Sequence, residues 1–319
     1  MGHFSFGDYS GVCREIAMIS CPLLGERTGI VPDCYSRNID INNTIIFQPA
    51  TCLIHFAAIL MTVLIIYHVR IKYTAVGRQE ILLFFYLYII SELLAPFLES
   101  AVIPTHDGVY IWFAAIYVGL KCAIFWCLML NGFVGFQFAE DGTPLSLWIL
   151  RISTLVFWAI GFAVAACTYI GSGTLGPTND KQTALWFFEL IFPLITVLIY
   201  VIAQVILIVR TLNDMWHLSD IVFGVLAYVS ALILTYGFSN KICENVKHYI
   251  DGTFFCALCM LFAVMMVYKY WDAITKEDLE FSVGSKMVNW DVKEPFLSDY
   301  EPSFSNDAMR SSASTMRQY

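Results

Sequence analysis

The stretch ILLFFYLYIISELLAPFLESAVI, residues 81–103, decides the fold class of this chain. Apart from two serines and two glutamates it is built of apolar and aromatic residues and one proline. It is long enough for a helix to cross a bilayer core, which takes about 20 residues at a rise of about 1.5 Å each. Because lipid cannot satisfy backbone hydrogen bonds, we expect an α-helix, and the residues do not alternate as those of a barrel strand would.

Further segments of the same kind occur along the sequence, so we expect an all-α membrane protein with about seven transmembrane helices. The predicted helices cover residues 47–69, 81–103, 110–132, 147–169, 185–209, 221–238 and 252–268. Hydrophobic residues make up 58% of the chain and charged residues only 14%, whereas a soluble domain carries about a quarter charged residues. We therefore divide the chain into an N-terminal tail at 1–46, a membrane domain at 47–270, and a polar C-terminal tail at 271–319 that is expected to be largely disordered.

Lysine and arginine residues are distributed unevenly over the two sides of the predicted bundle. Arg70, Lys72 and Arg78 follow the first helix, whereas Arg37 alone lies close before it. Over the whole chain, one side holds eleven such residues and the other holds six. Cytoplasmic loops carry the excess of positive charge, so we predict a lumenal N-terminus and a cytoplasmic C-terminus. The net charge of −8, without any basic stripe, argues against nucleic acid as a partner.

Four of the ten cysteines fall on the predicted lumenal side: Cys13, Cys21, Cys34 and Cys243. That side is oxidising, so we predict at least one disulfide among them. Four cysteines allow three pairings, and a bridge to Cys243 would tie the N-terminal tail to the loop before the last helix. Asn42 begins an Asn-Asn-Thr sequon on the same side and is a candidate for N-glycosylation, although it lies close to the first helix.

Two charged residues lie near the middle of the predicted membrane helices, Glu92 in the second and Lys121 in the third. Unpaired charges in lipid are costly, so we predict that Glu92 and Lys121 form an ion pair, which Glu99 could join from nearer the lumenal interface. Such a pair could be purely structural, could recognise polar groups on a partner's membrane helix, or could belong to a proton or ion pathway. Glu189 lies close to a helix end and is expected to reach headgroups or water.

Catalytic motifs are missing from the sequence. The six histidines are scattered, and no HExxH or GxSxG motif occurs. Cys256 and Cys259 have the spacing of half a zinc site, but they lie in an apolar helix without a second pair. We therefore predict that the chain is not an enzyme and that it holds no metal and no cofactor. Seven helices alone would also suit a receptor or a small-solute transporter.

The polar blocks at the helix edges are more distinctive than the helices. They read PDCYSRNIDINNTIIF at 32–47, KYTAVGR at 72–78, GFVGF at 132–136 with EDGT at 140–143, ICENVKHYIDG at 242–252, and MMVYKYWD at 265–272 with DLEF at 278–281. Together and in this order, the blocks closely resemble the fungal chitin synthase export chaperones over about residues 30 to 281. The extreme N-terminus and the tail beyond this region carry no comparable signature.

The resemblance implies a multi-pass resident of the endoplasmic reticulum membrane. Such a protein would bind a newly made chitin synthase, itself a polytopic membrane enzyme, and permit its folding and export, so that cell-wall chitin synthesis would depend on it indirectly. The family brings no catalytic residues. Asp278 and Glu280 also have the Asp-x-Glu form of an acidic export signal, which would add the vesicle-coat machinery to the partners, besides the client and the lipid bilayer. A match of this length also arises by chance, and a seven-helix receptor or small-solute transporter stays the alternative.

Overall fold

The computed structural model describes residues 6–25, 29–41, 44–73, 75–136, 143–171, 182–212 and 215–291, with side chains as far as Thr275 except at residues 41, 44, 211, 212 and 215. Asn42 lies outside the described residues, and so do the side chains of Asp278 and Glu280. Residues up to Thr275 form one compact unit, and every contact described below lies within it.

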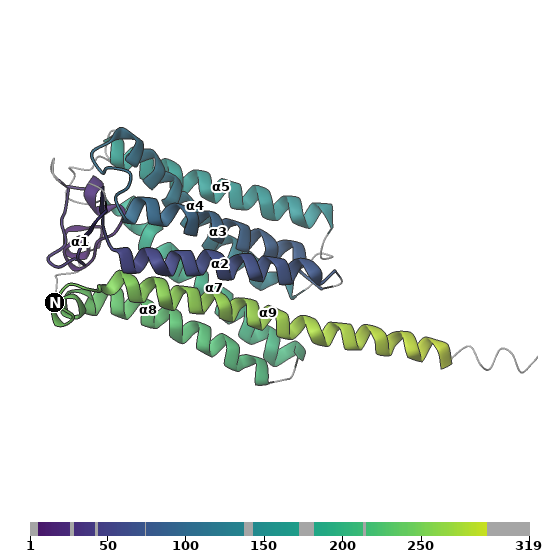
Figure 1. The fold of residues 1–319 in the computed structure, drawn as a ribbon. Coiled ribbons are helices and arrows are strands. Elements are labelled where there is room, and N and C mark those ends of the chain that lie inside the picture. Colours follow the sequence, from purple (N-terminus) through teal and green to yellow (C-terminus); the bar gives the residue numbers. More distant parts are fainter. Residues whose placement is uncertain are drawn as a thin grey trace, which may run out of the picture. The chain divides into compact units, whose positions relative to one another are not determined.

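Among the described residues, seven helices are long and apolar enough to cross a membrane. They are α2 Pro49–Ile71, α3 Arg78–Glu99, α4 Gly108–Val134, α5 Pro144–Ile170, a composite helix over Thr183–Arg210, α8 Leu218–Asn245, and α9 Gly252–Asp291, whose apolar part is Gly252–Thr275. Figure 1 shows them side by side in a bundle. Each predicted segment overlaps one of these helices, and the seven long apolar helices are consistent with the predicted all-α membrane protein.

Several helix ends differ from the predicted ones, and α8 continues to Asn245 and not only to residue 238. α3 ends at Glu99 and not at residue 103, because Ala101 has a φ of 51°, a left-handed conformation that cannot continue the helix. α9 continues beyond residue 268 to Asp291. The prediction ended each helix where the apolar residues ended, but a helix satisfies its own backbone hydrogen bonds in water as well as in lipid.

The composite helix continues beyond its apolar span, Thr183–Arg210, to Leu212 and consists of four consecutive pieces. These are α6 Thr183–Trp186, the π-helical turn η3 Phe187–Ile191, α7 Phe192–Leu207 and a second π-helical turn, η4 Ile208–Leu212. Pro193 has no N–H to donate to the carbonyl of Glu189 one turn earlier, so a regular α-helix would leave that carbonyl unsatisfied. The wider turn accommodates this break, and the Glu189 side chain within it is buried in the protein.

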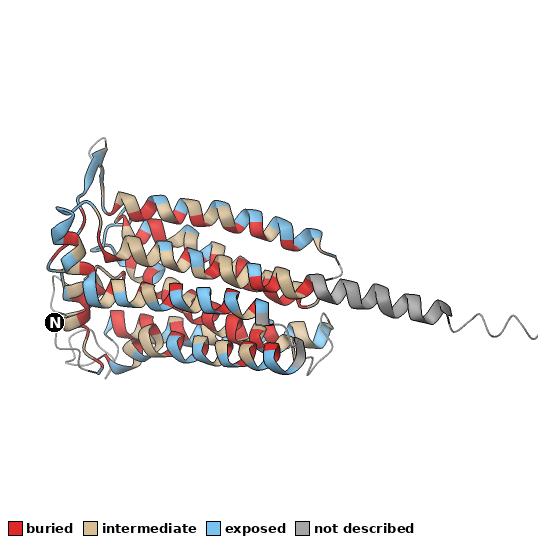
Figure 2. Cartoon of the chain, turned by 90° about the horizontal axis from the view of Figure 1, so that it is seen from below, coloured by how far each residue is buried: buried red, intermediate tan, exposed pale blue. Residues whose placement is uncertain are grey.

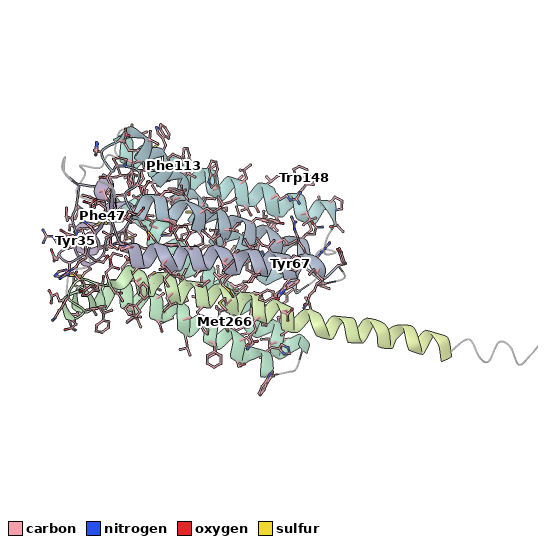
Figure 3. All side chains as sticks on the ribbon, in the orientation of Figure 1. Tyr35, Phe47, Tyr67, Phe113, Trp148 and Met266 are labelled. Carbon is pink, nitrogen blue, oxygen red and sulfur yellow. A yellow bond between two sulfur atoms is a disulfide. The ribbon has the colours of Figure 1, made fainter. Side chains whose placement is uncertain are left out.

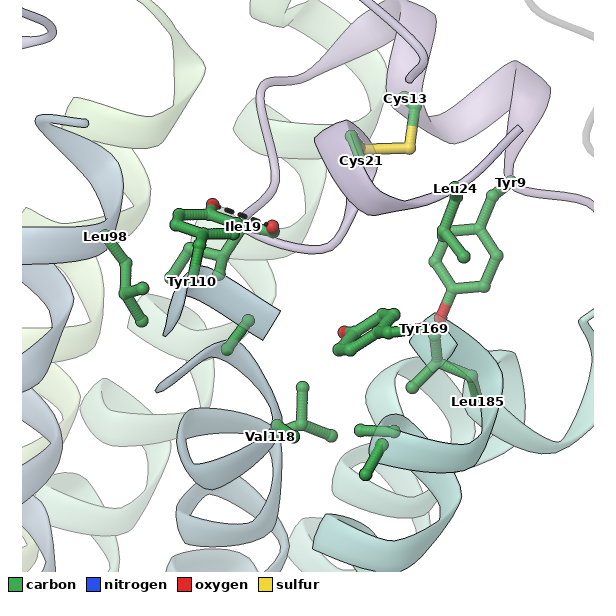
Figure 4. Packing of buried hydrophobic residues seen from close by; sticks show 14 residues of the cluster. Tyr9, Cys13, Ile19, Cys21, Leu24, Leu98, Tyr110, Val118, Tyr169 and Leu185 are labelled. Carbon is green, nitrogen blue, oxygen red and sulfur yellow. Dashed lines mark hydrogen bonds between the residues drawn. A yellow bond between two sulfur atoms is a disulfide. The ribbon is translucent and has the colours of Figure 1, made fainter. Parts of the chain in front are cut away.

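The N-terminal residues cover one end of the bundle, which we name the capped end (Figure 1). They contain the short helix α1 Ser10–Glu15, the 3-10 turn η1 Cys21–Leu23, and an antiparallel hairpin of β1 Ile39–Ile41 and β2 Thr44–Ile46, in which Ile39 pairs with Ile46. Figure 4 shows Ile19 and Leu24 of this cap beside helix residues such as Tyr110 and Tyr169. Because cap and helices share one hydrophobic cluster, the N-terminal tail is packed on the bundle.

The opposite end, at which α2 and α4 end and α3, α5 and α8 begin, is named the distal end. The 3-10 turn η5 Met215–His217 precedes α8 there. Figure 2 shows buried residues along the whole length of the bundle between the two ends. α4 is its central helix, since 67% of its most apolar window is buried, compared with 17% for α9. Large apolar side chains such as Leu53, Leu60 and Leu155 are exposed on the outer faces, as lipid contact requires.

Close approach of α4 and α5 depends on glycine at two positions. A Cβ atom on Gly119 would lie 2.8 Å from the carbonyl oxygen of Trp158, and one on Gly161 would lie 2.8 Å from the Sγ of Cys122. Real Cβ atoms do not approach so closely, so larger residues would push the helices apart. Small residues at helix contacts are typical of membrane bundles, in which packing rather than water exclusion holds the helices together.

Candidate functional site

A cluster of charged side chains lies between α2 and α3. The Nδ1 atom of His55 is 2.6 Å from the Oε2 of Glu92, and its Nε2 atom is 3.0 Å from the Oε2 of Glu99. The two glutamates are two helical turns apart on one face of α3, which allows a single imidazole to reach both. All three side chains are at most 16% exposed. Either the imidazole donates from both nitrogens as a cation, or one carboxyl group carries the shared proton.

The predicted ion pair between Glu92 and Lys121 is not formed, because Glu92 pairs with His55. Among the described residues, no carboxylate lies within 4.0 Å of the Lys121 ammonium, whose Nζ atom lies over the Tyr117 ring at 5.8 Å. Glu99 does share a partner with Glu92, as expected, but that partner is His55. The sequence reasoning matched opposite formal charges and overlooked a histidine in the preceding helix, seven residues into α2, as a counter-charge.

Glu189 joins the cap to the composite helix. It accepts hydrogen bonds from the Tyr9 hydroxyl at 2.8 Å and from the Ser20 hydroxyl at 2.7 Å, and the Tyr169 hydroxyl donates to Ser20 at 2.8 Å. The carboxylate is 6% exposed, so the expectation that it reaches headgroups or water is wrong. Burial and the neighbouring Glu189 carboxylate raise the pKa of Tyr9 well above its ordinary value, which keeps the phenol protonated as a donor.

Two disulfides use the four cysteines of the predicted lumenal side. Cys13 pairs with Cys21 within the cap, and Cys34 pairs with Cys243 near the end of α8. The second bridge therefore ties the cap to the segment before α9, and the first lies beside Leu24 in Figure 4. His248 places its Nδ1 atom 3.2 Å from the Sγ of Cys34, but the sulfurs are joined to each other and are not free thiolate ligands for a metal.

Asp251 fixes the beginning of α9 to the beginning of α2. Its carboxylate accepts from Gln48 Nε2 at 2.9 Å and from Thr253 Oγ1 at 2.6 Å, and it caps the helix by accepting from the backbone N–H of Phe254 at 3.3 Å. Asp251 is 2% exposed, and this burial raises its pKa above the usual value for an aspartate. Sequence reasoning missed this contact, although Asp-Gly-Thr before an apolar run is a helix-start pattern.

The distal end is held by two ion pairs. Lys269 on α9 donates to the Oδ1 of Asp220 on α8 at 2.8 Å, and Lys72, after α2, pairs with Asp272 of α9. The Trp271 indole donates to the Val76 carbonyl in the loop before α3 at 3.2 Å. These contacts join α9 to both neighbouring parts of the bundle, and all of their residues except Asp220 lie in the polar blocks quoted from the sequence.

A cavity of about 730 Å³ lies inside the bundle. Residues of the cap, α2, α3, α4, the composite helix, α8 and α9 line it. Figure 3 shows the side chains on these helices as sticks, with Met266 of α9 labelled. His55, Glu92, Glu99 and Lys121 all lie on its wall, together with Glu189 and Asp220. The charged residues that the sequence analysis selected therefore face one common space, although they do not pair as predicted.

Comparison with known proteins decides the family. The model of the chitin synthase export chaperone family matches residues 5–285. This chain belongs to the chitin synthase export chaperone family. Membership confirms the resemblance inferred from the polar helix edges, and the match extends further towards the N-terminus than those edges did.

Relatives in the export chaperone family match nearly the whole chain. A protein named chitin synthase export chaperone from Cryptococcus neoformans var. neoformans serotype D is 55% identical over 306 residues, which are 96% of this chain and 84% of the relative. Proteins of the same name from Neurospora crassa and from Fusarium oxysporum f. sp. lycopersici are 50% and 47% identical, cover 91% of this chain, and are themselves covered to 82% and 88%. No solved structure matches the chain.

The export chaperone family is named for a chaperone and not for an enzyme, and the matches do not favour the receptor or transporter alternatives. The geometry of this member agrees with a binding role. Its buried polar groups fix helices and the cap to one another, and its cavity brings charged side chains together.

Proposed function

We propose that this chain is a membrane chaperone that a chitin synthase needs for folding and for export from the endoplasmic reticulum. The observation that carries the proposal is the family match over almost the entire seven-helix bundle, with relatives of the same name at about half identity. Cell-wall chitin synthesis would depend on the chain through delivery of the enzyme. The chain would bind its client and would not turn over a substrate.

An orientation with the N-terminus in the lumen is part of the proposal. Disulfides persist in oxidising compartments, and both disulfides of this chain lie at the capped end. Arg70, Lys72 and Arg78 lie at the distal end, where the positive-inside rule places the cytoplasm. Asn42 would then be available to the glycosylation machinery, and the C-terminal tail with Asp278 and Glu280 would face the vesicle-coat machinery.

The physical task of such a chaperone is to shield polar groups in the membrane helices of a polytopic client before the client has completed its own packing. Helices associate in lipid through close packing and hydrogen bonds rather than through water exclusion. This bundle offers wide apolar outer faces on α2, α5 and α8 for that purpose, and its firmly tied cap keeps the helices in place while a client is bound.

Deletion of the gene with localisation of a tagged chitin synthase tests the proposed function. We expect the synthase to remain in the endoplasmic reticulum and wall chitin to fall, and re-expression of this chain should restore both. A tagged unrelated polytopic protein should reach the cell surface in the deletion strain and serves as the control for general export. Normal surface delivery of every chitin synthase would overturn the proposal.

The orientation has its own test. A glycosidase-sensitive mobility shift that disappears in Asn42→Gln would place the capped end in the lumen. If Asn42 is not occupied, a single new sequon in a longer linker before residue 30 gives the same readout at a greater distance from the membrane. Labelling of a C-terminal tag from the cytoplasm, in selectively permeabilised cells, checks the other end.

A further inference from the structure

The cavity inside the bundle carries an inference that does not concern the client. We propose that it binds a single-chain amphiphile whose anionic head, a carboxylate or a phosphate, pairs with Lys121. The cavity volume of about 730 Å³ lies within the range of about 300–1,000 Å³ that is usual for small-ligand sites. Its walls are mainly apolar and carry a few charged groups, which is the composition expected of a site for such a ligand.

The hydrogen bonds that the charged wall residues already make predict the charge of the ligand. Glu92 and Glu99 are bonded to His55, Glu189 to Tyr9 and Ser20, and Asp220 to Lys269. Lys121 differs from all of them. Among the described residues, its ammonium has an aromatic ring as its neighbour, at 5.8 Å, and no acceptor at hydrogen-bond distance. Its donors are therefore available to a ligand, whereas the carboxylates are already engaged.

An anion would stabilise an ammonium group in this position more than the ring of Tyr117 does. Lys121 lies in the middle of α4, the most deeply buried of the seven helices. A charge at this depth in a membrane is costly without a partner, and a cation–π contact offsets only part of that cost. A carboxylate or phosphate head would neutralise the charge and accept its hydrogen bonds.

An apolar lining extends from Lys121 towards the distal end of the bundle. Phe84, Leu128, Val197 and Val264 lie on the cavity wall on the distal side of Lys121 and offer an apolar lining for a hydrocarbon tail. The inference does not depend on the client, so its failure would leave the proposed function unaffected.

Thermal unfolding of the full-length protein, purified in a neutral detergent, tests the proposal. Oleate and oleyl phosphate supply the anionic heads, and oleyl alcohol supplies the same chain without a charge. We expect the anions to raise the unfolding midpoint in a saturable manner, because a ligand that binds only the folded state stabilises it. Oleyl alcohol should have little effect, and the stronger of the two anions identifies the preferred head group.

Variants of Lys121 provide the decisive comparison. Lys121→Met should weaken the apparent oleate affinity at least about tenfold, whereas Lys121→Arg, which keeps the charge, should retain the response. Lys241→Met is the matched control, because Lys241 also lies over an aromatic ring, that of Phe238 at 5.6 Å, but on the exposed surface outside the cavity.

Photolabelling of the unaltered protein gives a test that does not depend on the folding of any variant. A fatty acid with a diazirine in its chain should label α4, α7 or α9 of the unaltered protein, and oleate should compete whereas oleyl alcohol should not. Equal effects of oleate and oleyl alcohol, an undiminished oleate response in Lys121→Met, or labelling that oleate does not reduce would each overturn the proposal. So would a Lys121→Met protein that responds fully to oleate but no longer co-purifies with chitin synthase, since Lys121 would then serve the client.

Discussion

The two ends of the bundle are held by different kinds of interaction. At the capped end, two disulfides and the hydrogen bonds of the buried Glu189 fix the N-terminal residues to the helices. At the distal end, two ion pairs link α9 to its neighbours, and their lysine side chains are 26% and 61% exposed. Salt screens partly exposed ion pairs, but it does not weaken covalent bonds and affects buried hydrogen bonds little.

This difference indicates where the molecule can open. Local unfolding begins in regions with few buried contacts and weak links. α9 is the least buried of the seven membrane helices. Beyond its contacts at Asp251, it packs against the other helices through apolar residues such as Val264, and its polar links include the distal ion pairs and the Trp271 indole. We therefore expect the distal part of α9 to separate first and the capped end to unfold last.

Removal of the long-range disulfide should have the largest effect on stability. Cys34 and Cys243 are 209 residues apart in sequence, whereas Cys13 and Cys21 are 8 apart. In the chain-entropy treatment, the Cys34–Cys243 bridge stabilises the folded state by about 5 kcal/mol and the Cys13–Cys21 bridge by about 2–3 kcal/mol. We expect Cys34→Ala with Cys243→Ala to lower the unfolding midpoint in detergent more than Cys13→Ala with Cys21→Ala does. An equal or larger effect of the short-range pair would contradict this account.

Replacement of His55 should have the next largest effect. His55→Ala leaves Glu92 and Glu99 on one helix face without their partner, and breaking a buried charge pair costs about 3–5 kcal/mol. Combining it with Glu92→Gln and Glu99→Gln should restore most of the lost stability, since no uncompensated charge then remains. Lys121→Met serves as the comparison and should cost much less in the unfolding midpoint. If Lys121→Met were as destabilising as His55→Ala, the predicted Glu92–Lys121 pair would deserve preference over the histidine pair.

The sequence predicted the helices well because lipid imposes a strong and local requirement. An apolar run of sufficient length must be helical, and each of the seven runs is helical. Helix ends were less accurate, because the end of α3 depends on the left-handed conformation of Ala101, which an apolar run does not reveal. The cysteines at the capped end could be selected from topology alone, but their pairing depends on how the cap packs against α8.

Most polar residues of the site could be identified from the sequence, but the pairs that they form could not. Glu92, Glu99 and Lys121 were identified because charges in lipid are rare, yet which of them meet depends on the rotation of each helix about its axis. His55 carries no formal charge in the sequence and was therefore not considered beside Glu92. Glu189 was placed near water because the prediction contained no cap, and residues such as Tyr9 and Ser20 could not be assigned to it from a distance of about 170–180 positions in sequence.

Glu189 offers a test of the capped end that does not involve sulfur chemistry. Glu189→Leu leaves the hydroxyls of Tyr9 and Ser20 without their acceptor, and we expect a loss of about 2–3 kcal/mol. Tyr9→Phe removes only one of these hydrogen bonds and should cost about 1 kcal/mol. Limited proteolysis should cut the N-terminal residues faster in Glu189→Leu than in the unaltered protein. Unchanged proteolysis with an unchanged unfolding midpoint would mean that the disulfides alone hold the cap.

The smallest effect is expected at the distal end, where Lys269→Met removes the ion pair with Asp220. The lysine is 61% exposed, and an ion pair of this kind contributes at most about 1 kcal/mol. Raising the salt concentration from about 0.05 M to about 0.5 M should therefore lower the unfolding midpoint of the unaltered protein slightly and that of Lys269→Met less, since the pair is screened in one and missing in the other. Hydrogen exchange should show faster opening near Trp271 in the variant, with no change at Cys34. If Lys269→Met cost as much stability as Glu189→Leu, the distal end would be held as firmly as the capped end, and α9 would have no preferred point at which to open.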